Sequence, residues 1–393
     1  MATLFTNAKL LLEDCEQYGW LLVEGEKIAA LGNMETMPVA PHAKRVDVRG
    51  AYLSPGWIDL HVHGGGGHDF MDATPEAIEG AAKFHLKHGT TTLLPTTVAC
   101  SDEEYIRLLS CFREVKLTMQ HGPNMPGLHL EGPYIATEHA GAQDMRYIRV
   151  PEQAHIKKLL DAGGADIARM TAAVELDGAF ILGDMLKQRG IIGSIGHSGA
   201  TFDQVKEGLR HGFTHVTHFY STMSTIRRVN AYRVLGVVES PYLLNDLTVE
   251  IIADGSHLPK ELLQLITGHI AHNRISLITD AMRGAGLPEG SEILLGSSEN
   301  GQLAIVKDSV AFLPDFTAFA GSVCTADRCI LTMRDMVGIP LYQAVALMSS
   351  SPAAVLGIAR QKGKLSPGYD ADLLVFDHNI QMNQVWVMGK QAY

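Results

Sequence analysis

Six residues with metal-binding or proton-transferring side chains each follow a short apolar segment of the sequence. They are His61 and His63 in DLHVHGGGG, Glu131 in GLHLEGPY, His197 in IGSIGHSG, His218 in HVTHFY and Asp280 in SLITDAM. Imidazole nitrogens and carboxylate oxygens bind zinc and similar divalent ions, and a carboxylate beside such an ion can accept a proton from water. The six residues are far apart in the sequence, so only the fold can bring them together.

The strongest local pattern is the pair His61 and His63. Two residues apart on a strand, their imidazoles project from the same face and can reach one metal at about 2.0–2.1 Å. With 18 histidines in 393 residues, roughly one such pair is expected by chance, so the pair alone is weak. The glycines at positions 64–67 strengthen it, because they let the backbone turn sharply beside a pocket.

The other four residues each have a structural explanation as well. Glu131 could cap its strand, and Asp280 could be the N-cap of the next segment. His197 and His218 could be hydrogen-bonded core residues. Other histidines compete as ligands on composition alone: His211, His215 and His257. None of the four residues is a convincing ligand alone. They become candidate site residues as a set, because each one ends a predicted strand.

Strand-like and helix-like segments alternate between residues 54 and 357. The predicted strands are SPGWIDLHVH, TTTLLPTTVA, GLHLEGPY, MTAAVE, IIGSIGHS, HVTHFY, EIIADGSH and ISLITDAM. Such alternation favours right-handed βαβ units and a parallel sheet. Eight continuously apolar strands favour closure into a TIM-like (β/α)8 barrel, whose active sites lie at the carboxyl ends of the strands. Residues 281–319 look loop-rich.

The two ends of the chain have a different character. Residues 1–53 and 358–393 show short alternating strands with Gly, Pro and Asp between them, and neither end can bury a core alone. We expect one small β-sandwich domain built from both ends, with residues 54–357 as a separate (β/α)8 barrel that contains the active site.

Composition narrows the class of protein. A hydrophobic content of 46% indicates a well-cored globule, and a net charge of −11 argues against a nucleic-acid partner. No apolar run approaches the roughly 20 residues of a membrane helix, and no secretory signal pattern is present. The cysteines have no paired spacing: Cys15, Cys100, Cys111, Cys324 and Cys329. We expect a cytoplasmic protein with reduced thiols that binds no membrane.

Together these motifs resemble the amidohydrolase superfamily and, within it, the N-acetylglucosamine-6-phosphate deacetylases. The resemblance runs from PGWIDLHVHGGGG through HLEGPY, GHSGAT, THFYSTM, DGSH and TDAM to GKLSPGYDADLLVFD. It implies a metal-dependent (β/α)8 barrel with a β-sandwich made from both termini. It also implies cleavage of the acetamide of a phosphorylated amino sugar, in a protein that is usually a homodimer.

The resemblance assigns roles to the six residues. Glu131, His197 and His218 match the ligands of the site that the family retains, usually for zinc, with iron, manganese or cobalt as alternatives. His61 and His63 match a pair with which a second ion can bind. The fourth strand, MTAAVE, offers no lysine to bridge two metals, so Glu131 is the more plausible bridge. This feature speaks against dihydroorotase-like or hydantoinase-like chemistry.

The resemblance also implies a set of substrate-binding residues. They are Ala142, Gln143, Ser221, Thr222, Arg228, Arg233, His257, Phe319, Ala320 and Gly321. Gln143 stands where the family commonly has a histidine, Ser221-Thr222 replaces Asn-Ala, and Phe319 replaces leucine. These departures lie where the sugar and phosphate would bind, so the reaction type is better defined than the substrate.

A phosphate-binding arginine is expected from the segment IRRVNAYRVLG, donated across the dimer interface. Arg233 has the better position relative to Gly236, whereas Arg228 is nearer the usual distance from His218, and Arg227 is a third candidate. Arg283, after TDAM, is a further cation near the expected pocket.

We therefore expect hydrolysis of N-acetyl-D-glucosamine 6-phosphate to D-glucosamine 6-phosphate and acetate. The nucleophile is a water whose pKa a divalent metal lowers to about 7, and Asp280 serves as general base and acid. One alternative is another N-acyl amino sugar, such as N-acetylgalactosamine 6-phosphate. An alternative of another class is a non-catalytic amidohydrolase-like scaffold, which would not need the five ligands and Asp280.

Overall fold

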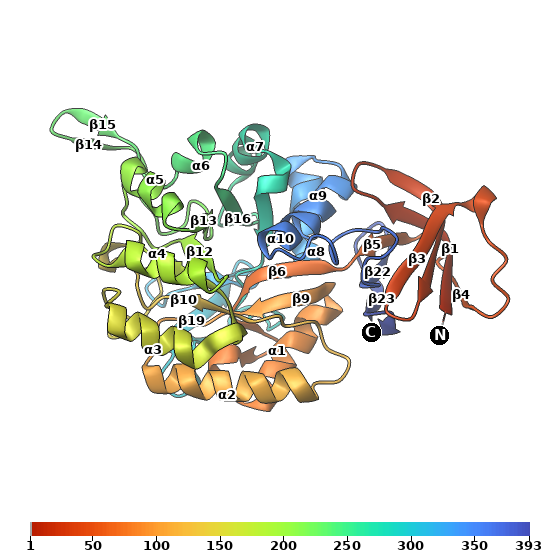
Figure 1. The fold of residues 1–393 in the computed structure, drawn as a ribbon, viewed down its shortest axis with the longest axis horizontal. Coiled ribbons are helices and arrows are strands. Elements are labelled where there is room, and N and C mark those ends of the chain that lie inside the picture. Colours follow the sequence, from red (N-terminus) through yellow and green to blue (C-terminus); the bar gives the residue numbers. More distant parts are fainter. Residues whose placement is uncertain (1) are drawn as a thin grey trace.

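Strands and helices alternate along the central part of the computed structural model, which describes residues 2–393 (Figure 1). Eight strands make up this part. They are β6 (Trp57–Val62), β9 (Thr90–Pro95), β10 (Leu128–Glu131), β11 (Ile167–Ala172), β12 (Ile192–Ile195), β13 (Phe213–Val216), β16 (Thr248–Ile252) and β17 (Ile275–Ile278). Candidate site residues lie at or near the carboxyl ends of β6, β10, β12, β13, β16 and β17. The mixed α/β content agrees with the sequence pattern.

Parallel pairing connects these strands. Six form one sheet in the order β10-β11-β12-β13-β16-β17, and β6 pairs with β9. A parallel bridge between Thr96 and His129 joins the end of β9 to β10. The backbone N–H of Asp280, just after β17, donates to the carbonyl of His61 at 2.9 Å. The carboxyl ends of the strands therefore meet on one side of the protein.

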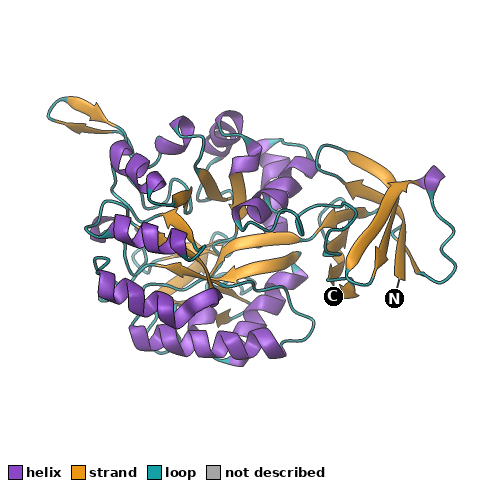
Figure 2. Ribbon diagram, viewed as in Figure 1, coloured by secondary structure: helices purple, strands orange, loops and turns teal. Residues whose placement is uncertain are grey.

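Helices surround these strands (Figure 2). They are α1 (Pro75–Lys87), α2 (Asp102–Thr118), α3 (Gln153–Gly163), α4 (Ala179–Gln188), α5 (Phe202–Arg210), α6 (Ser240–Leu243), α7 (Lys260–His269), α8 (Ala326–Leu331), α9 (Leu341–Leu347) and α10 (Ser350–Val355). Ser101 and Thr201 begin α2 and α5 with capping boxes to Glu104 and Gln204, which satisfy free backbone N–H groups. None of the helices within residues 2–393 is long and apolar enough to cross a membrane.

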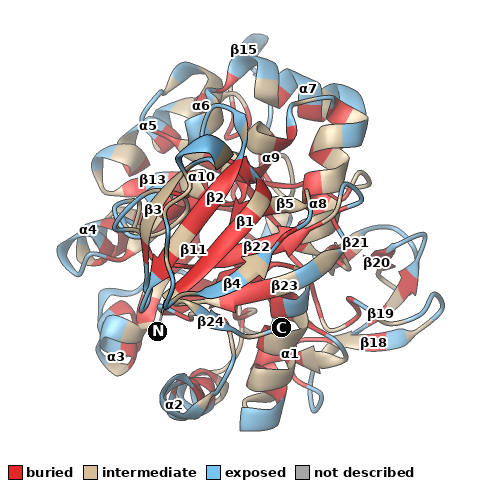
Figure 3. Cartoon of the chain, turned by 90° about the vertical axis from the view of Figure 1, so that its right-hand side faces the viewer, coloured by how far each residue is buried: buried red, intermediate tan, exposed pale blue. Residues whose placement is uncertain are grey.

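Both ends of the chain contribute to one mixed sheet. Its strands are β1 (Ala2–Leu11), β2 (Glu16–Glu24), β3 (Lys27–Asn33), β4 (Lys44–Asp47), β5 (Tyr52–Pro55), β22 (Leu373–Phe376), β23 (Met382–Val387) and β24 (Lys390–Gln391). The order is β24-β23-β22-β5-β1-β2-β3, with β4 paired to β1. Phe5 and Trp386 pack edge to face at 5.1 Å in its core, and buried residues cover much of β1 and β2 (Figure 3).

Residues 281–319 are mostly turns and irregular backbone, as expected, but they also contain strands that the sequence analysis did not predict. These strands form an antiparallel sheet of β18 (Glu292–Leu295), β19 (Gln302–Lys307), β20 (Val310–Phe312) and β21 (Phe319–Ser322). Its apolar residues form a small core of their own, including Ile293, Ala304 and Val306. Two short hairpins complete the chain: β7 (Gly64–Gly65) with β8 (His68–Asp69), and β14 (Arg227–Val229) with β15 (Tyr232–Val234).

Candidate metal centre and active site

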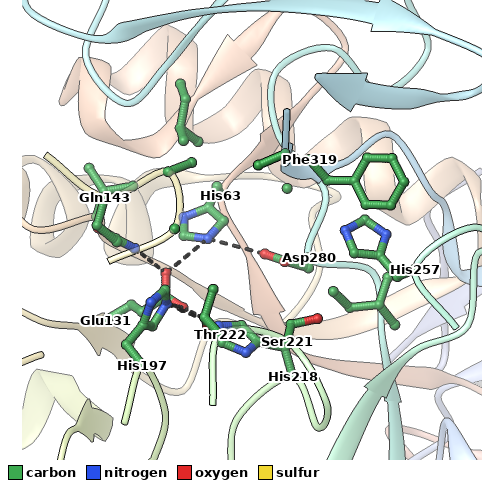
Figure 4. Close-up of a pocket in the computed structure, with 17 residues that line it drawn as sticks. His63, Glu131, Gln143, His197, His218, Ser221, Thr222, His257, Asp280 and Phe319 are labelled. Atoms are coloured by element: carbon green, nitrogen blue, oxygen red, sulfur yellow. Dashed lines mark hydrogen bonds and ion pairs between the residues drawn. The ribbon is translucent and has the colours of Figure 1, made fainter. Parts of the chain in front are cut away.

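Two groups of buried side chains with potential ligand atoms lie where the parallel strands end, and Figure 4 shows all of them except His61. One group is His61, His63 and Asp280, and the other is Glu131, His197 and His218. Within each group the ligand atoms lie within 4.8 Å of one another. The structure thus brings together all six residues that the sequence singled out.

Glu131 lies between the two groups. Its Oε1 is 3.1 Å from His197 Nε2 and 3.0 Å from His218 Nε2. Its Oε2 is 3.4 Å from His63 Nε2. On the far side, Asp280 Oδ1 is 3.3 Å from His63 Nε2 and 3.4 Å from His61 Nε2. The Glu131 carboxylate therefore contacts histidines of both groups, as a bridging ligand would.

The backbone conformation directs three of these side chains. His197, His218 and Asp280 each lie two residues beyond the end of a strand and have φ values of 48°, 26° and 47°. Left-handed φ values are uncommon for residues other than glycine and carry strain that clusters at functional sites. A residue with positive φ therefore follows each of three strands of one sheet, β12, β13 and β17, and the three side chains line one pocket.

The donor atoms fit a divalent metal. His61 Nε2 lies 3.2 Å from His63 Nε2, and His197 Nε2 lies 3.1 Å from His218 Nε2, with the carboxylates beside them. Converging imidazole nitrogens and carboxylate oxygens form the mixed N/O set that zinc and similar ions accept. A divalent cation is the group that would satisfy all these lone pairs at once.

The charges of the two groups also favour the binding of a cation. Burial opposes ionisation of Glu131, but the neighbouring imidazoles, His61 foremost, hold its pKa well below the usual value. Burial likewise opposes the charge of Asp280, but the imidazoles of His61 and His63 lower its pKa. Burial disfavours the imidazolium of His63, yet Asp280 and Glu131 raise its pKa to about 9. The two carboxylates therefore create a potential that attracts a cation.

A charged pair that the sequence analysis missed lies beneath these groups. Glu250 on β16 contacts His61 and Arg169, and both charged residues are fully buried. Burial opposes ionisation of Glu250, but Arg169 and His61 hold its pKa well below the usual value. The available signal was a charged residue inside an otherwise apolar strand, as in IARMTA and TVEII.

Most of the expected substrate-binding residues line a pocket of about 220 Å³ above the metal groups. Those that do are Ala142, Gln143, Ser221, Thr222, His257, Phe319 and Gly321. Ala320 is buried beside the pocket without lining it. His257 is held by Asp254, whose Oδ2 lies 2.7 Å from its Nδ1, and its ring packs against Phe319 at 4.7 Å.

The side-chain amide of Gln143 is occupied by protein groups. Its Nε2 donates to Glu131 Oε2 at 2.6 Å, and its Oε1 accepts the backbone N–H of Ala99 at 2.7 Å. Gln143 therefore orients the carboxylate between the metal groups, although it also borders the pocket (Figure 4).

The expected arginines lie outside the pocket. Arg228 and Arg233 face each other across the exposed β14–β15 hairpin, and Arg227 Nη1 donates to the Gly199 carbonyl at 3.0 Å. Arg283 is bound to Asp72 by two hydrogen bonds. Within residues 2–393, no lysine or arginine lines this pocket. A cation for a substrate phosphate would have to come from beyond the pocket walls.

Comparisons with known proteins agree with this geometry. The family model described as Amidohydrolase family matches residues 52–392. The chain is 34% identical over 352 residues to an N-acetylglucosamine-6-phosphate deacetylase of Lysinibacillus sphaericus, covering 89% of this chain and 88% of that protein. It is 29% identical over 386 residues to an N-acetylgalactosamine-6-phosphate deacetylase of Escherichia coli O157:H7, covering 98% and 97%. The crystal structure of N-acetylglucosamine-6-phosphate deacetylase from Pasteurella multocida is 27% identical, with a TM-score of 0.90 and coverage of 100% and 99%.

Proposed function

The chain belongs to the amidohydrolase family, and from that premise we propose that it hydrolyses N-acetyl-D-glucosamine 6-phosphate to D-glucosamine 6-phosphate and acetate. The observation that carries the proposal is the buried convergence of five potential ligands and Asp280 beneath one pocket. An N-acetylglucosamine-6-phosphate deacetylase that is 34% identical over 89% of this chain supports the choice of substrate.

A divalent ion, which we propose to be zinc, would be held by Glu131, His197 and His218. A second ion would be held by His61, His63 and Asp280, with Glu131 facing both. Iron, manganese and cobalt are alternatives for the same N/O donors. Such an ion, when bound, polarises the amide carbonyl and makes a nearby water more acidic.

Asp280 is the proposed general base and acid. Its carboxylate borders the pocket and lies beside the imidazoles of His61 and His63, so it is close to any water bound at that group. In the first step it accepts a proton from the attacking water. In the second step it delivers that proton to the amine nitrogen, which otherwise leaves poorly.

Recognition of the phosphate is proposed to involve a second copy of the chain. Arg228 and Arg233 lie on the β14–β15 hairpin, which projects from the body of the protein (Figure 1). The same hairpin exposes Val229 and Tyr232, the latter 77% exposed, although such side chains usually favour burial. Contact with a partner subunit would cover them and bring an arginine to the partner's pocket.

For the architecture, we propose a closed (β/α)8 barrel over residues 54–357 and a small β-sandwich domain over residues 1–53 and 358–393. Residue 1 lies outside the described residues. Support for the barrel comes from the contacts that link β9 to β10 and the end of β17 to β6. Support for the small domain comes from the sheet shared by both ends of the chain.

A cytoplasmic location is part of the proposal. The five free cysteines are compatible with a reducing compartment.

The E. coli relative supports N-acetylgalactosamine 6-phosphate as the second candidate substrate. The test is a comparison of kcat/KM for both sugar phosphates and for their unphosphorylated forms. The highest value is expected for N-acetylglucosamine 6-phosphate. A higher kcat/KM for N-acetylgalactosamine 6-phosphate would make that sugar the preferred substrate. Acetate release at the background rate from every sugar would support a non-catalytic scaffold.

A further inference from the structure

The interior of the parallel sheet contains an ion pair directly beneath the candidate metal groups. Arg169 of β11 and Glu250 of β16 are both 0% exposed. Arg169 Nη1 contacts Glu250 Oε2, its Nε donates to Ser194 Oγ at 2.7 Å, and its Nη2 donates to Thr217 Oγ1 at 2.8 Å. The guanidinium is therefore fixed by three strands, and it fixes Glu250 in turn.

The second oxygen of Glu250 reaches both metal groups. Its Oε1 lies 2.8 Å from His61 Nδ1 and accepts the backbone N–H of His218 at 3.1 Å. In a neutral imidazole only one nitrogen is protonated, so a carboxylate that accepts from Nδ1–H leaves Nε2 free to bind a cation. That Nε2 faces Asp280 Oδ1 at 3.4 Å and Glu131 Oε1 at 3.5 Å. His61 is thus held in the tautomer that can bind a cation.

The histidines differ in how their remote nitrogens are held. His197 Nδ1 is 2.8 Å from the backbone carbonyl of His139. His63 Nδ1 and His218 Nδ1 are buried and have no hydrogen-bond partner among residues 2–393. In the group of His61, His63 and Asp280, Glu250 therefore supplies the contact that selects an imidazole tautomer.

A buried ion pair is a poor way to fill such an interior. Barrel-like interiors are usually packed with branched apolar side chains, and replacing a buried ion pair by apolar residues is often neutral or stabilising. Stability alone therefore does not explain the Arg169–Glu250 pair. Its contact with His61 indicates that it positions this imidazole.

We propose that Glu250, held by Arg169, is a positioning residue that fixes His61 as a ligand and so sets the affinity of the His61–His63–Asp280 group for a divalent cation. The proposal rests on the metal groups of the proposed function and not on the identity of the sugar.

The test is a Co²⁺ titration of metal-free protein, followed by visible absorption and by metal analysis of the washed protein. The wild-type protein is expected to bind two ions per chain. Glu250→Gln is expected to keep the ion at Glu131, His197 and His218 and to bind the other ion about 10- to 100-fold more weakly. The spectrum reports the ligand sphere directly, which a loss of stability alone would not change.

Two further variants separate positioning from lost charge. Asp372→Asn removes a buried carboxylate that pairs with Lys362 at 2.6 Å, away from the metal groups, and is expected to bind Co²⁺ like the wild type. Arg169→Met/Glu250→Leu removes both charges and leaves no unpaired ion, so it is expected to fold while still binding the second ion weakly. This double variant carries the test if Glu250→Gln does not fold.

Three outcomes overturn the proposal. They are a wild-type chain that binds a single ion, a Glu250→Gln chain with both wild-type affinities, and a double variant with restored affinity. The readout is metal binding, so a failure to deacetylate any sugar would contradict the proposed function and leave this result intact.

Discussion

Gln143 Nε2 donates a hydrogen bond to Glu131 Oε2 at 2.6 Å, and Gln143 Oε1 accepts the Ala99 backbone N–H at 2.7 Å. Both ends of the amide are thus engaged by the protein. The family resemblance led us to expect Gln143 among the substrate-binding residues. In this chain the geometry favours a different role, in which Gln143 orients the carboxylate between the two metal groups.

Gln143→Leu should lower kcat about 10- to 100-fold and change KM little, because it removes a contact to a metal ligand while keeping the side-chain volume. Steady-state kinetics with metal analysis of the same preparation is the measurement. A rise in KM at unchanged kcat would instead assign Gln143 to the substrate.

Asp280→Asn should lower kcat by about 10²- to 10⁴-fold, since asparagine cannot take up the proton of the attacking water or protonate the amine. Acetate release measures the rate, and an ion retained by Glu131, His197 and His218, which do not include the altered residue, shows that this part of the site is still formed. Wild-type activity in this variant would remove Asp280 from the chemistry. If the variant and the wild type both release acetate only at the uncatalysed rate, the protein would be a non-catalytic scaffold.

Removal of metal should abolish activity and lower the melting temperature, because an ion that binds only the folded chain stabilises it by mass action. At a metal concentration 100 times Kd the stabilisation is about 2.7 kcal/mol. Dialysis against a chelator, followed by addition of Zn²⁺, Fe²⁺, Mn²⁺ or Co²⁺ in separate samples, would also identify the preferred ion. Full activity in metal-free protein would contradict the metal centre.

Asp370 links the two ends of the chain. Its Oδ1 is 2.5 Å from Lys27 Nζ on β3, and its Oδ2 is 2.9 Å from Lys362 Nζ. Burial raises the pKa of Asp370, but the two lysines outweigh it and the net pKa is lowered.

A lowered pKa stabilises the folded state above the unfolded value of about 3.9, and this stabilisation is lost as pH falls through the folded pKa. Asp370→Asn should therefore reduce the free energy of unfolding by about 1 kcal/mol at pH 7. Urea unfolding at several pH values should show the difference from wild type narrowing below pH 4. A difference that is constant with pH would mean that the charge is not responsible.

The positions of the six site residues were predictable because strand ends are visible in the sequence. Apolar runs such as IGSI and ISLI are followed by His197 and Asp280, and parallel strands bring their carboxyl ends together. Arg169 and Glu250 were not predictable in the same way. A charge inside a short strand is usually solvated, and only the paired geometry shows that each one neutralises the other.

The sheet within residues 281–319 was not predicted, for a different reason. Their strands are short and antiparallel, and Gly and Pro between them resemble loop signals. The apolar positions that become a core, such as Ile293 and Val306, are too widely spaced to show a period.

The arginine that would bind the phosphate belongs to a second copy of the chain, according to the proposed dimer. Arg228→Ala/Arg233→Ala should then be nearly inactive on phosphorylated sugar, because no other cation lines the pocket within residues 2–393. Arg210→Ala, which removes an exposed arginine paired with Glu207, serves as the control and should leave activity unchanged.

Mixing the arginine variant with Asp280→Asn gives the decisive measurement. In a heterodimer, the chain with native Asp280 receives its arginines from the Asp280→Asn chain, so one of the two sites is complete. Random pairing makes about half of all dimers mixed, so about a quarter of the wild-type activity should return. Activity that never exceeds the sum of the two separate variants would mean that the arginines serve their own chain or do not contact the phosphate.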